Sequence, residues 1–257
     1  RLNPIDSSYV EMINHALDLI DEGKYQAVII GHEGANFSAG ANLNLFLELS
    51  QNNQWDTLDF AVKTFQNTTQ RIRFSKGPVV AAPFQLTLGG GTEIIQPAAH
   101  RVASAETYMG FVEMGVGLIP GGGGNLRMIL NAIDENKGAM GAFQKIQKAF
   151  ETIGFAKVAT GAYEAKDLGL LKQDDTIIMN RDYLIQAAKD KALELVNGYS
   201  PPKYNDSLKL PGAGGRTAMA MALKSFKLQG KISDHDVKIG EKLAYVLTGG
   251  DQAGLTK

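Results

Sequence analysis

The sequence predicts an α/β protein with an α/β core over residues 1–155 and a helical lobe over residues 156–257. In the first part, short buried strands alternate with helices, a pattern typical of largely parallel sheets. After about Leu130 the helical period dominates. The composition, with 44% hydrophobic and 21% charged residues, is that of an ordinary globular protein.

Helices and strands are predicted to alternate over residues 1–155. Ser8 and Glu11 are spaced as a capping box in front of an amphipathic helix, and Gly23 is a plausible stop for that helix. Val10, Ile13, Leu17 and Ile20 form its apolar face. The elements expected next are a strand at 26–31, a helix at 55–74, a strand at 77–83, a short helix at 93–96 and a strand at 101–104.

The second part reads as helices. Amphipathic segments predict helices at 181–198 and 214–230, with residues 201–215 as a loop or linker. Ser233 and Asp236 begin a further helix, which ends at the Gly249–Gly250 pair. The pattern assigns no role to residues 131–150.

The composition argues against several classes of binding partner and functional site. The net charge of -1 favours neither nucleic acid nor a membrane surface as a partner. Cysteine is absent, which excludes disulfides and thiolate chemistry, and with four histidines we expect no metal site. No apolar run is long enough to cross a membrane and no signal-peptide pattern opens the chain, so we expect a cytoplasmic protein.

Three glycine-bearing stretches stand out. They read "NFSAGANL" (36–43), "LGGGTE" (88–93) and "VEMGVGLIPGGGG" (112–124). Small residues leave backbone N–H groups open to a ligand, and a helix that starts at such a stretch adds partial positive charge. The last stretch lacks the Lys and Ser/Thr that complete a P-loop. Plain tight turns would explain any one of the three alone.

Two glutamates occur in these stretches, and their neighbours in the sequence are mainly apolar. Glu93 lies in the segment "GGGTEII" and Glu113 in "MGFVEMGVGL". Both segments are mostly apolar or glycine, so neither glutamate is expected on a solvent-exposed face. Two backbone N–H groups from different loops can form an oxyanion hole, and two carboxylates can hold a water and exchange protons. Desolvation and mutual repulsion would raise the pKa of one carboxyl group. The set suits chemistry in which a carbonyl becomes an enolate and returns.

The three stretches, in this order, resemble the crotonase (enoyl-CoA hydratase/isomerase) superfamily. The resemblance runs from about Asn3 to Leu171 and continues less distinctly beyond it. It implies a crotonase-like (ClpP/crotonase) spiral of ββα units with a C-terminal helical lobe that serves oligomerisation. It also implies a homotrimer or a dimer of trimers.

The resemblance also implies site residues. Ala41 matches the first oxyanion donor and Gly90 the second, so Ala39, Gly40, Ala41 and Gly90 would bind the thioester of the substrate. Glu93 and Glu113 match the two catalytic glutamates of hydratases. By analogy Glu93 activates water and Glu113 delivers the proton, a division that the sequence alone leaves open. No permanently bound cofactor is implied, and coenzyme A enters as part of the thioester substrate.

A narrower resemblance concerns the segments "KGPVVAAPFQLTLGGG", "ETYMGFVEMGVGLIPGGGGN" and "GKISDHDVKIGEKLAYVLTGG". They are similar to the hydratase portion of fused 3-hydroxyacyl-CoA dehydrogenase/enoyl-CoA hydratase proteins. A fused or associated 3-hydroxyacyl-CoA dehydrogenase is therefore the implied partner, and fatty-acid β-oxidation the implied context. Acyl chain length stays open.

Other functions compete with hydration. A Δ3-Δ2 enoyl-CoA isomerase of the same fold can work with the second glutamate alone. A non-catalytic acyl-CoA-binding subunit would bind the ligand without turnover. A serine peptidase of the related ClpP-like spiral would need a serine at a glycine-flanked elbow with matched His and Asp, which this sequence lacks.

Overall fold

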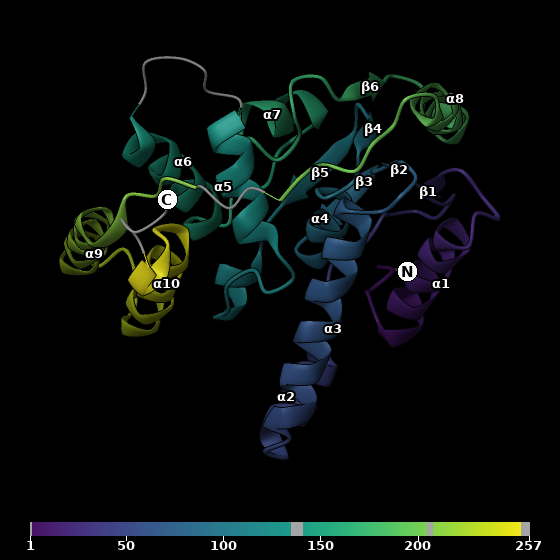
Figure 1. The fold of residues 1–257 in the computed structure, drawn as a ribbon. Helices are drawn as coiled ribbons and strands as arrows, with labels where there is room; N and C mark the ends of the chain where they lie inside the picture. The colour runs from purple at the N-terminus through teal and green to yellow at the C-terminus, as the bar shows by residue number, and fades with distance from the viewer. Residues whose placement is uncertain (1, 135–140, 205–207, 253–257) are drawn as a thin grey trace. The chain divides into compact units, whose positions relative to one another are not determined.

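The computed structural model describes residues 2–134, 141–204 and 208–252. These residues form two compact units that interleave along the chain (Figure 1). The first unit contains Arg1–Gly110, Gly121–Gly124 and Val158–Lys203; the second contains Phe111–Pro120, Asn125–Lys157 and Tyr204–Lys257. A division into domains at residue 155 stays a prediction.

Two parallel sheets form the centre of the first unit. The larger has the order β1-β2-β4-β6, and the smaller pairs β3 with β5. The strands are β1 (Val28–Ile30), β2 (Val79–Ala81), β3 (Gln85–Leu88), β4 (His100–Ser104), β5 (Thr107–Gly110) and β6 (Thr176–Ile178). The middle strands β2 and β4 are buried along their whole length, as short apolar runs in parallel sheets usually are.

The chain alternates between these two sheets. The strand β2 is followed by β3 and then by the helix α4 (Gly90–Ile95), and β4 is followed by β5. Single bridges extend the smaller sheet on both sides, from Ser38 to Thr87 and from Gly110 to Val158. Each turn therefore adds one strand to each sheet, which is the expected spiral of ββα units.

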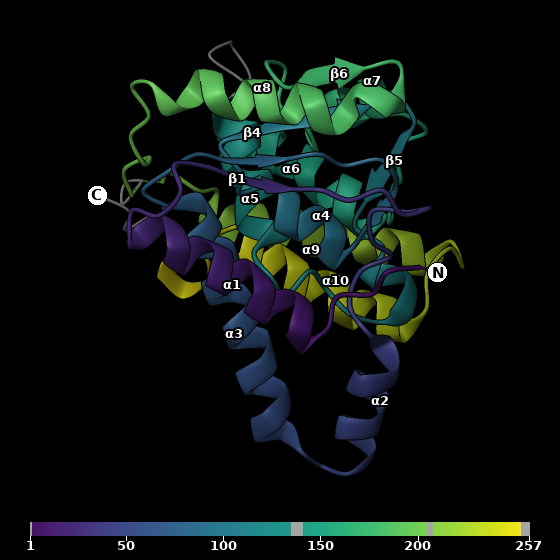
Figure 2. The same ribbon diagram turned by 90° about the vertical axis from the view of Figure 1, so that its right-hand side faces the viewer.

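Helices cover both faces of the larger sheet. The helix α8 (Leu184–Val196) packs on β1, β2 and β4, and α1 (Ser7–Asp21) packs on β1 and on α3 (Trp55–Arg73) from the other side (Figure 2). The remaining helical elements of this unit are α2 (Leu43–Gln51), α7 (Ala162–Asp167) and the 3-10 turn η2 (Arg181–Tyr183).

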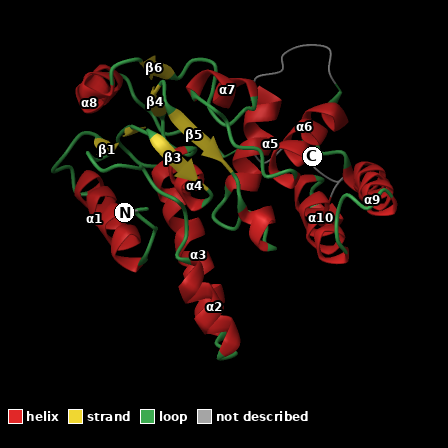
Figure 3. Ribbon diagram, turned by 180° about the vertical axis from the view of Figure 1, so that it is seen from behind, coloured by secondary structure: helices red, strands yellow, loops and turns green. Residues whose placement is uncertain are grey.

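The regular elements among the described residues of the second unit are all helical, joined by loops (Figure 3). Its centre is α10 (Asp234–Leu247), which packs against α9 (Gly212–Leu228) and α6 (Ala142–Gly154). The other elements are the 3-10 turns η1 (Glu113–Val116) and η3 (Gly250–Gln252), and α5 (Gly124–Asp134), whose first residue belongs to the first unit. No helix among residues 2–134, 141–204 and 208–252 is both long enough and apolar enough to span a bilayer.

Several expected elements are confirmed, and one cap is wrong. The buried face of α1 consists of the four predicted apolar residues, but its N-cap is Asp6, which accepts a hydrogen bond from the N–H of Tyr9. Ser8 therefore lies inside the helix. The predicted start of α10 at Ser233 and Asp236 is confirmed, and the two residues form a capping box. The segment 131–150 contains the end of α5 and the start of α6, and its residues 135–140 lie outside the described residues.

Candidate active site

The loop that carries Ala39, Gly40 and Ala41 is fixed by backbone contacts from both sides. The N–H of Ala39 donates to the carbonyl of Leu2 (2.9 Å), and the carbonyl of Gly40 accepts the N–H of Ile5 (2.8 Å). Gly40 has a φ of 96°, and a Cβ there would lie 2.9 Å from the carbonyl oxygen of Leu88. Only glycine meets both conditions without strain.

The turn from β3 into α4 approaches the same loop. Gly89 has a φ of 52°, and its N–H donates to the carbonyl of Gly110 (2.8 Å). Gly90 then opens α4 and is buried. Thr92 ties α4 to β3, because its Oγ1 donates to the carbonyl of Thr87 (2.7 Å).

The amides of Ala41 and Gly90 lie side by side. A Cβ on Gly90 would lie 3.5 Å from the nitrogen of Ala41, and one on Gly40 would lie 3.2 Å from the nitrogen of Gly90. Within the part of the chain that the structure describes, neither N–H donates to a protein acceptor. Two free donors this close can stabilise one oxyanion together.

Glu93 lies one turn further along α4 and is 3% exposed. Its Oε1 accepts two hydrogen bonds, from the N–H of Gly122 (2.7 Å) and the N–H of Gly124 (2.8 Å). Burial raises the pKa of this carboxyl group to about 7, although the backbone N–H groups of the glycine turn act in the opposite direction. Such a group exchanges protons near neutral pH, as a general acid or base must.

The glycines at 121–124 are explained by how closely this turn packs on α3. A Cβ on Gly122 would lie 2.1 Å from the ring of Phe65 and 2.8 Å from Oε2 of Glu93. The side chains of Gln66 and Thr69, on the same helix, donate to the carbonyls of Gly121 (2.7 Å) and Gly122 (2.6 Å). The bare backbone therefore lets this turn reach Glu93.

Phe65 joins the two parts of the site in the first unit. Its ring tip would lie 3.6 Å from a Cβ on Gly90, and the ring also lies against Gly122. Sequence reasoning identified the glycines at 121–124 but missed that they bind Glu93, and it placed Phe65 only within the expected helix at 55–74. The four consecutive glycines without a phosphate-binding lysine were the available signal.

Glu113 belongs to the second unit. It is half-buried and begins η1, and its carbonyl accepts the N–H of Leu118 (3.0 Å). Gly117 closes this turn with a φ of 80°, and its carbonyl oxygen lies 3.2 Å from Nε2 of His235. A Cβ on Gly117 would lie 2.9 Å from the same nitrogen.

The structure thus brings Ala41, Gly90 and Glu93 together within the first unit. The placement of Glu113 opposite Glu93 is part of the proposal below. Within residues 2–134, 141–204 and 208–252, no group of three or more His, Asp or Glu side chains could hold a metal ion. The chemistry available at the described site is oxyanion stabilisation and proton transfer.

The sequence profile described as enoyl-CoA hydratase/isomerase matches residues 1–205. The chain belongs to this family. The expected crotonase superfamily and fold are confirmed by this match and by solved structures. An enoyl-CoA hydratase from Bacillus anthracis aligns with a TM-score of 0.62 at 24% identity, covering 96% of this chain and 82% of that one.

Two relatives from Bacillus subtilis (strain 168) show what the chain is similar to. One, named probable 3-hydroxyacyl-CoA dehydrogenase, is 44% identical over 251 residues, which cover 97% of this chain but 31% of that protein. The chain therefore spans about a third of the length of this relative. The other, named probable enoyl-CoA hydratase, is 29% identical over 81% of this chain and 79% of its own.

Proposed function

We propose that this protein is an enoyl-CoA hydratase, which adds water to a 2-enoyl-CoA to give a 3-hydroxyacyl-CoA in fatty-acid β-oxidation. The observation that carries the proposal is the pair of adjacent amides at Ala41 and Gly90, which have no protein acceptor among the described residues, beside the buried carboxyl group of Glu93. Membership of the enoyl-CoA hydratase/isomerase family supports a CoA thioester as the substrate.

The thioester oxygen of the substrate accepts hydrogen bonds from both amides, and Ala39 and Gly40 shape the loop around it. When water adds to C3, the electron pair of the C2–C3 double bond moves toward the carbonyl and negative charge gathers on this oxygen. Each donor aimed at that charge contributes roughly 10²–10³ in rate. Because both donors are backbone groups, steric bulk disrupts them more readily than a change of side-chain chemistry does.

A water molecule lies between Glu93 and Glu113 in this proposal. Glu93 takes a proton from the water as its oxygen bonds to C3, and Glu113, which carries a proton at the start, gives it to C2. Transfer of a proton from Glu93 back to Glu113 then restores the site, so atoms and charge balance over the cycle. The pKa of Glu93, raised by burial to about 7, supports its role as the base. Coenzyme A participates only as part of the substrate, and no permanently bound cofactor is required.

A 3-hydroxyacyl-CoA dehydrogenase is the proposed partner, either fused or associated. The name and greater length of the Bacillus subtilis relative support this assignment, since the product of hydration is the substrate of such a dehydrogenase. We also propose that the chain assembles as a homotrimer or a dimer of trimers and acts in the cytoplasm.

The test is the hydration of crotonyl-CoA by the purified protein, with Glu93→Gln and Glu113→Gln measured beside it. We expect formation of 3-hydroxybutyryl-CoA by the wild type and a loss of at least a hundredfold in both variants. An isomerase would instead convert a 3-enoyl-CoA, without net water addition, and would retain much of its activity in Glu93→Gln. A non-catalytic subunit would bind acyl-CoA equally in all three proteins and turn over none.

A further inference from the structure

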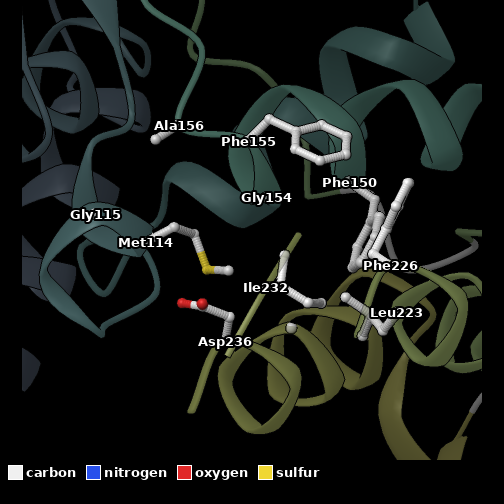
Figure 4. Close-up of a pocket in the computed structure, with 11 residues that line it drawn as sticks. Met114, Gly115, Phe150, Gly154, Phe155, Ala156, Leu223, Phe226, Ile232 and Asp236 are labelled. Atoms are coloured by element: carbon white, nitrogen blue, oxygen red, sulfur yellow. The ribbon is translucent and has the colours of Figure 1, made fainter. Parts of the chain in front are cut away.

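The 3-10 turn η1, which carries Glu113, is not fixed by buried side chains. None of its four residues is buried, and Val116 is 51% exposed. Between η1 and the helices α6, α9 and α10 lies an apolar cavity of about 230 Å³, which Met114 lines from the turn and Asp236 from α10 (Figure 4). Unfilled space removes van der Waals contacts from the side chains around it. The position of the turn therefore depends on its hydrogen bonds more than on packing.

The peptide between Gly117 and Leu118 links this turn to α10. Its N–H donates to the carbonyl of Glu113 (3.0 Å), and its carbonyl oxygen lies 3.2 Å from Nε2 of His235. A carbonyl only accepts hydrogen bonds, so Nε2 is the ring nitrogen that carries the proton in this contact. Because the peptide is planar and trans, its two polar groups point in opposite directions, and a bond to one fixes the direction of the other. His235 is therefore connected to the main chain of Glu113 through a single peptide unit.

The first turn of α10 is held by contacts on both sides of His235. Ser233, which precedes the helix, forms a capping box with Asp236. Asp234 forms an exposed ion pair with Lys227 of α9, the helix that packs against α10. The backbone that carries the imidazole is therefore fixed to its own helix and to the neighbouring one, so the ring donates from a defined position.

We propose that His235 is a positioning residue for the hydration reaction: by donating to the carbonyl of Gly117, it holds the turn that places the carboxyl group of Glu113. This inference rests on the proposed function, in which Glu113 delivers the proton to C2. His235 acts through the main chain rather than on the reacting atoms. A displacement of about 1 Å in a catalytic group can cost roughly a hundredfold in rate, so even partial loosening of the turn is measurable.

The experiment measures kcat and KM for crotonyl-CoA hydration in His235→Ala, His235→Gln and His235→Asn. Alanine removes the donor, whereas the amide nitrogen of glutamine is separated from Cβ by the same number of bonds as Nε2 of histidine. We expect His235→Ala to lower kcat roughly fivefold to tenfold, the factor for one lost hydrogen bond, with KM nearly unchanged. His235→Gln should restore most of the wild-type kcat. His235→Asn, whose amide nitrogen is one bond closer to the main chain, should resemble His235→Ala, and equal losses in all three variants would overturn the proposal.

A double variant separates positioning from a general loss of stability. In the Glu113→Gln background the acid group is already lost, so adding His235→Ala should change kcat by less than about twofold. A purely structural role would instead multiply the two losses. The matched control on the same turn is Ser233→Ala, which removes the cap but keeps the imidazole, so its kcat should stay within about twofold of the wild type. A loss of kcat in Ser233→Ala equal to that in His235→Ala would assign the effect to the stability of α10 and overturn the proposal.

The turn can also be followed without catalysis, so this inference and the hydratase function can fail separately. Hydrogen exchange with mass spectrometry of peptides covering residues 112–120 reports on the N–H of Leu118. Exchange there should be roughly fivefold to tenfold faster in His235→Ala than in the wild type, and unchanged in His235→Gln. If no 2-enoyl-CoA is hydrated, the proposed function fails, and equal exchange in His235→Ala and the wild type would overturn the role of His235 as well. If the wild type hydrates crotonyl-CoA but His235→Ala keeps its full kcat, the positioning role is overturned while the hydratase stands.

Discussion

The surroundings of Glu93 in the first unit and of Glu113 in the second hold their carboxylates by different means. Glu93 is 3% exposed and receives two backbone hydrogen bonds from a glycine turn. Glu113 is half-buried on a four-residue 3-10 turn, which Gly117 closes beside His235. Glu93 is thus fixed by main-chain geometry, whereas the turn of Glu113 depends on the side chains of its own helical unit.

This difference predicts which of the two carboxylates keeps its position when side chains around it are substituted. A carboxylate fixed by backbone N–H groups keeps its position when distant side chains vary, and burial keeps its pKa raised. A carboxylate on a short turn moves with that turn and with the helices that support it. The proposal accordingly assigns the base, whose pKa is raised, to the first unit and the proton donor to the second.

The largest effect is expected from removing either carboxylate. Glu93→Gln and Glu113→Gln should each lower kcat for crotonyl-CoA hydration by roughly 10²–10⁴, the range for a lost acid–base group. The assay follows 3-hydroxyacyl-CoA formation at saturating substrate.

The double variant sharpens this comparison. If both groups act on one water, the combined loss should fall well short of the product of the two single losses, because groups that act as a unit are not additive. Independent, multiplying losses would contradict a shared water. Binding of butyryl-CoA should be retained in all variants and serves as the control for folding.

The next effect concerns pH and stability. In the unfolded chain Glu93 titrates near its ordinary pKa of 4.5, and in the native protein near 7. Between these values the native state binds more protons than the unfolded state, so the free energy of unfolding falls as pH rises. The fall amounts to roughly 3 kcal/mol and levels off above pH 7.

Glu93→Gln lacks this ionisation but keeps an oxygen that can accept from Gly122 and Gly124. Urea unfolding of both proteins at pH 5 and pH 8 measures the difference. The unfolding free energy of the variant minus that of the wild type should be larger at pH 8 than at pH 5. Parallel pH dependence in the two proteins would show that the native pKa of Glu93 is not raised.

A somewhat smaller effect is expected at the glycine turn that holds Glu93. In Gly122→Ala the new methyl would meet the ring of Phe65 at 2.1 Å, so the turn or the ring must move. Overpacking of this kind costs about 1–3 kcal/mol of unfolding free energy, and displacement of the turn should also lower kcat. Gly121→Ala is the control, because its Cβ meets a single atom, Cγ1 of Val62, at 3.9 Å. Equal stability of the two variants would refute the tight packing.

The smallest effect is expected at the cap of α10 in the second unit. Ser233→Ala removes the hydroxyl that accepts from the N–H of Asp236 and donates to its carboxylate. Loss of such a cap costs about 1 kcal/mol. Crotonyl-CoA hydration should stay within about twofold of wild type in this variant. Chemical unfolding measures the first quantity and the standard assay the second; a loss of activity comparable to that of Glu113→Gln would mean that this cap belongs to the catalytic centre.

Much of the first unit could be predicted from sequence, since its signals are local. Short apolar runs marked β1, β2 and β4, and glycines marked the places where Ala41 and Gly90 expose their amides. The strand β3 was missed because Gln85–Leu88 merges with the glycine turn, and β5 because Thr107–Gly110 is not a continuous apolar run. The helix α2 was missed because Leu43–Gln51 directly follows the loop of Ala41 without a side-chain cap.

Contacts between distant segments could not be read from the sequence. The hydrogen bonds from Gly122 and Gly124 to Glu93 span 29 and 31 residues, and nothing in either segment alone specifies them. The cavity near Met114 is assembled from helices that are far apart in the chain. Even at α1, the cap was wrong because Ser8 and Glu11 have capping-box spacing, whereas Asp6 supplies the acceptor.

The most direct measurement of the central claim is a crystal structure of the protein with a bound 3-hydroxyacyl-CoA. We predict that the thioester oxygen lies about 3 Å from the nitrogens of both Ala41 and Gly90, with the carboxylates of Glu93 and Glu113 facing the 3-hydroxyl group. A thioester oxygen that contacts neither amide, or a 3-hydroxyl group out of reach of Glu93, would contradict the account.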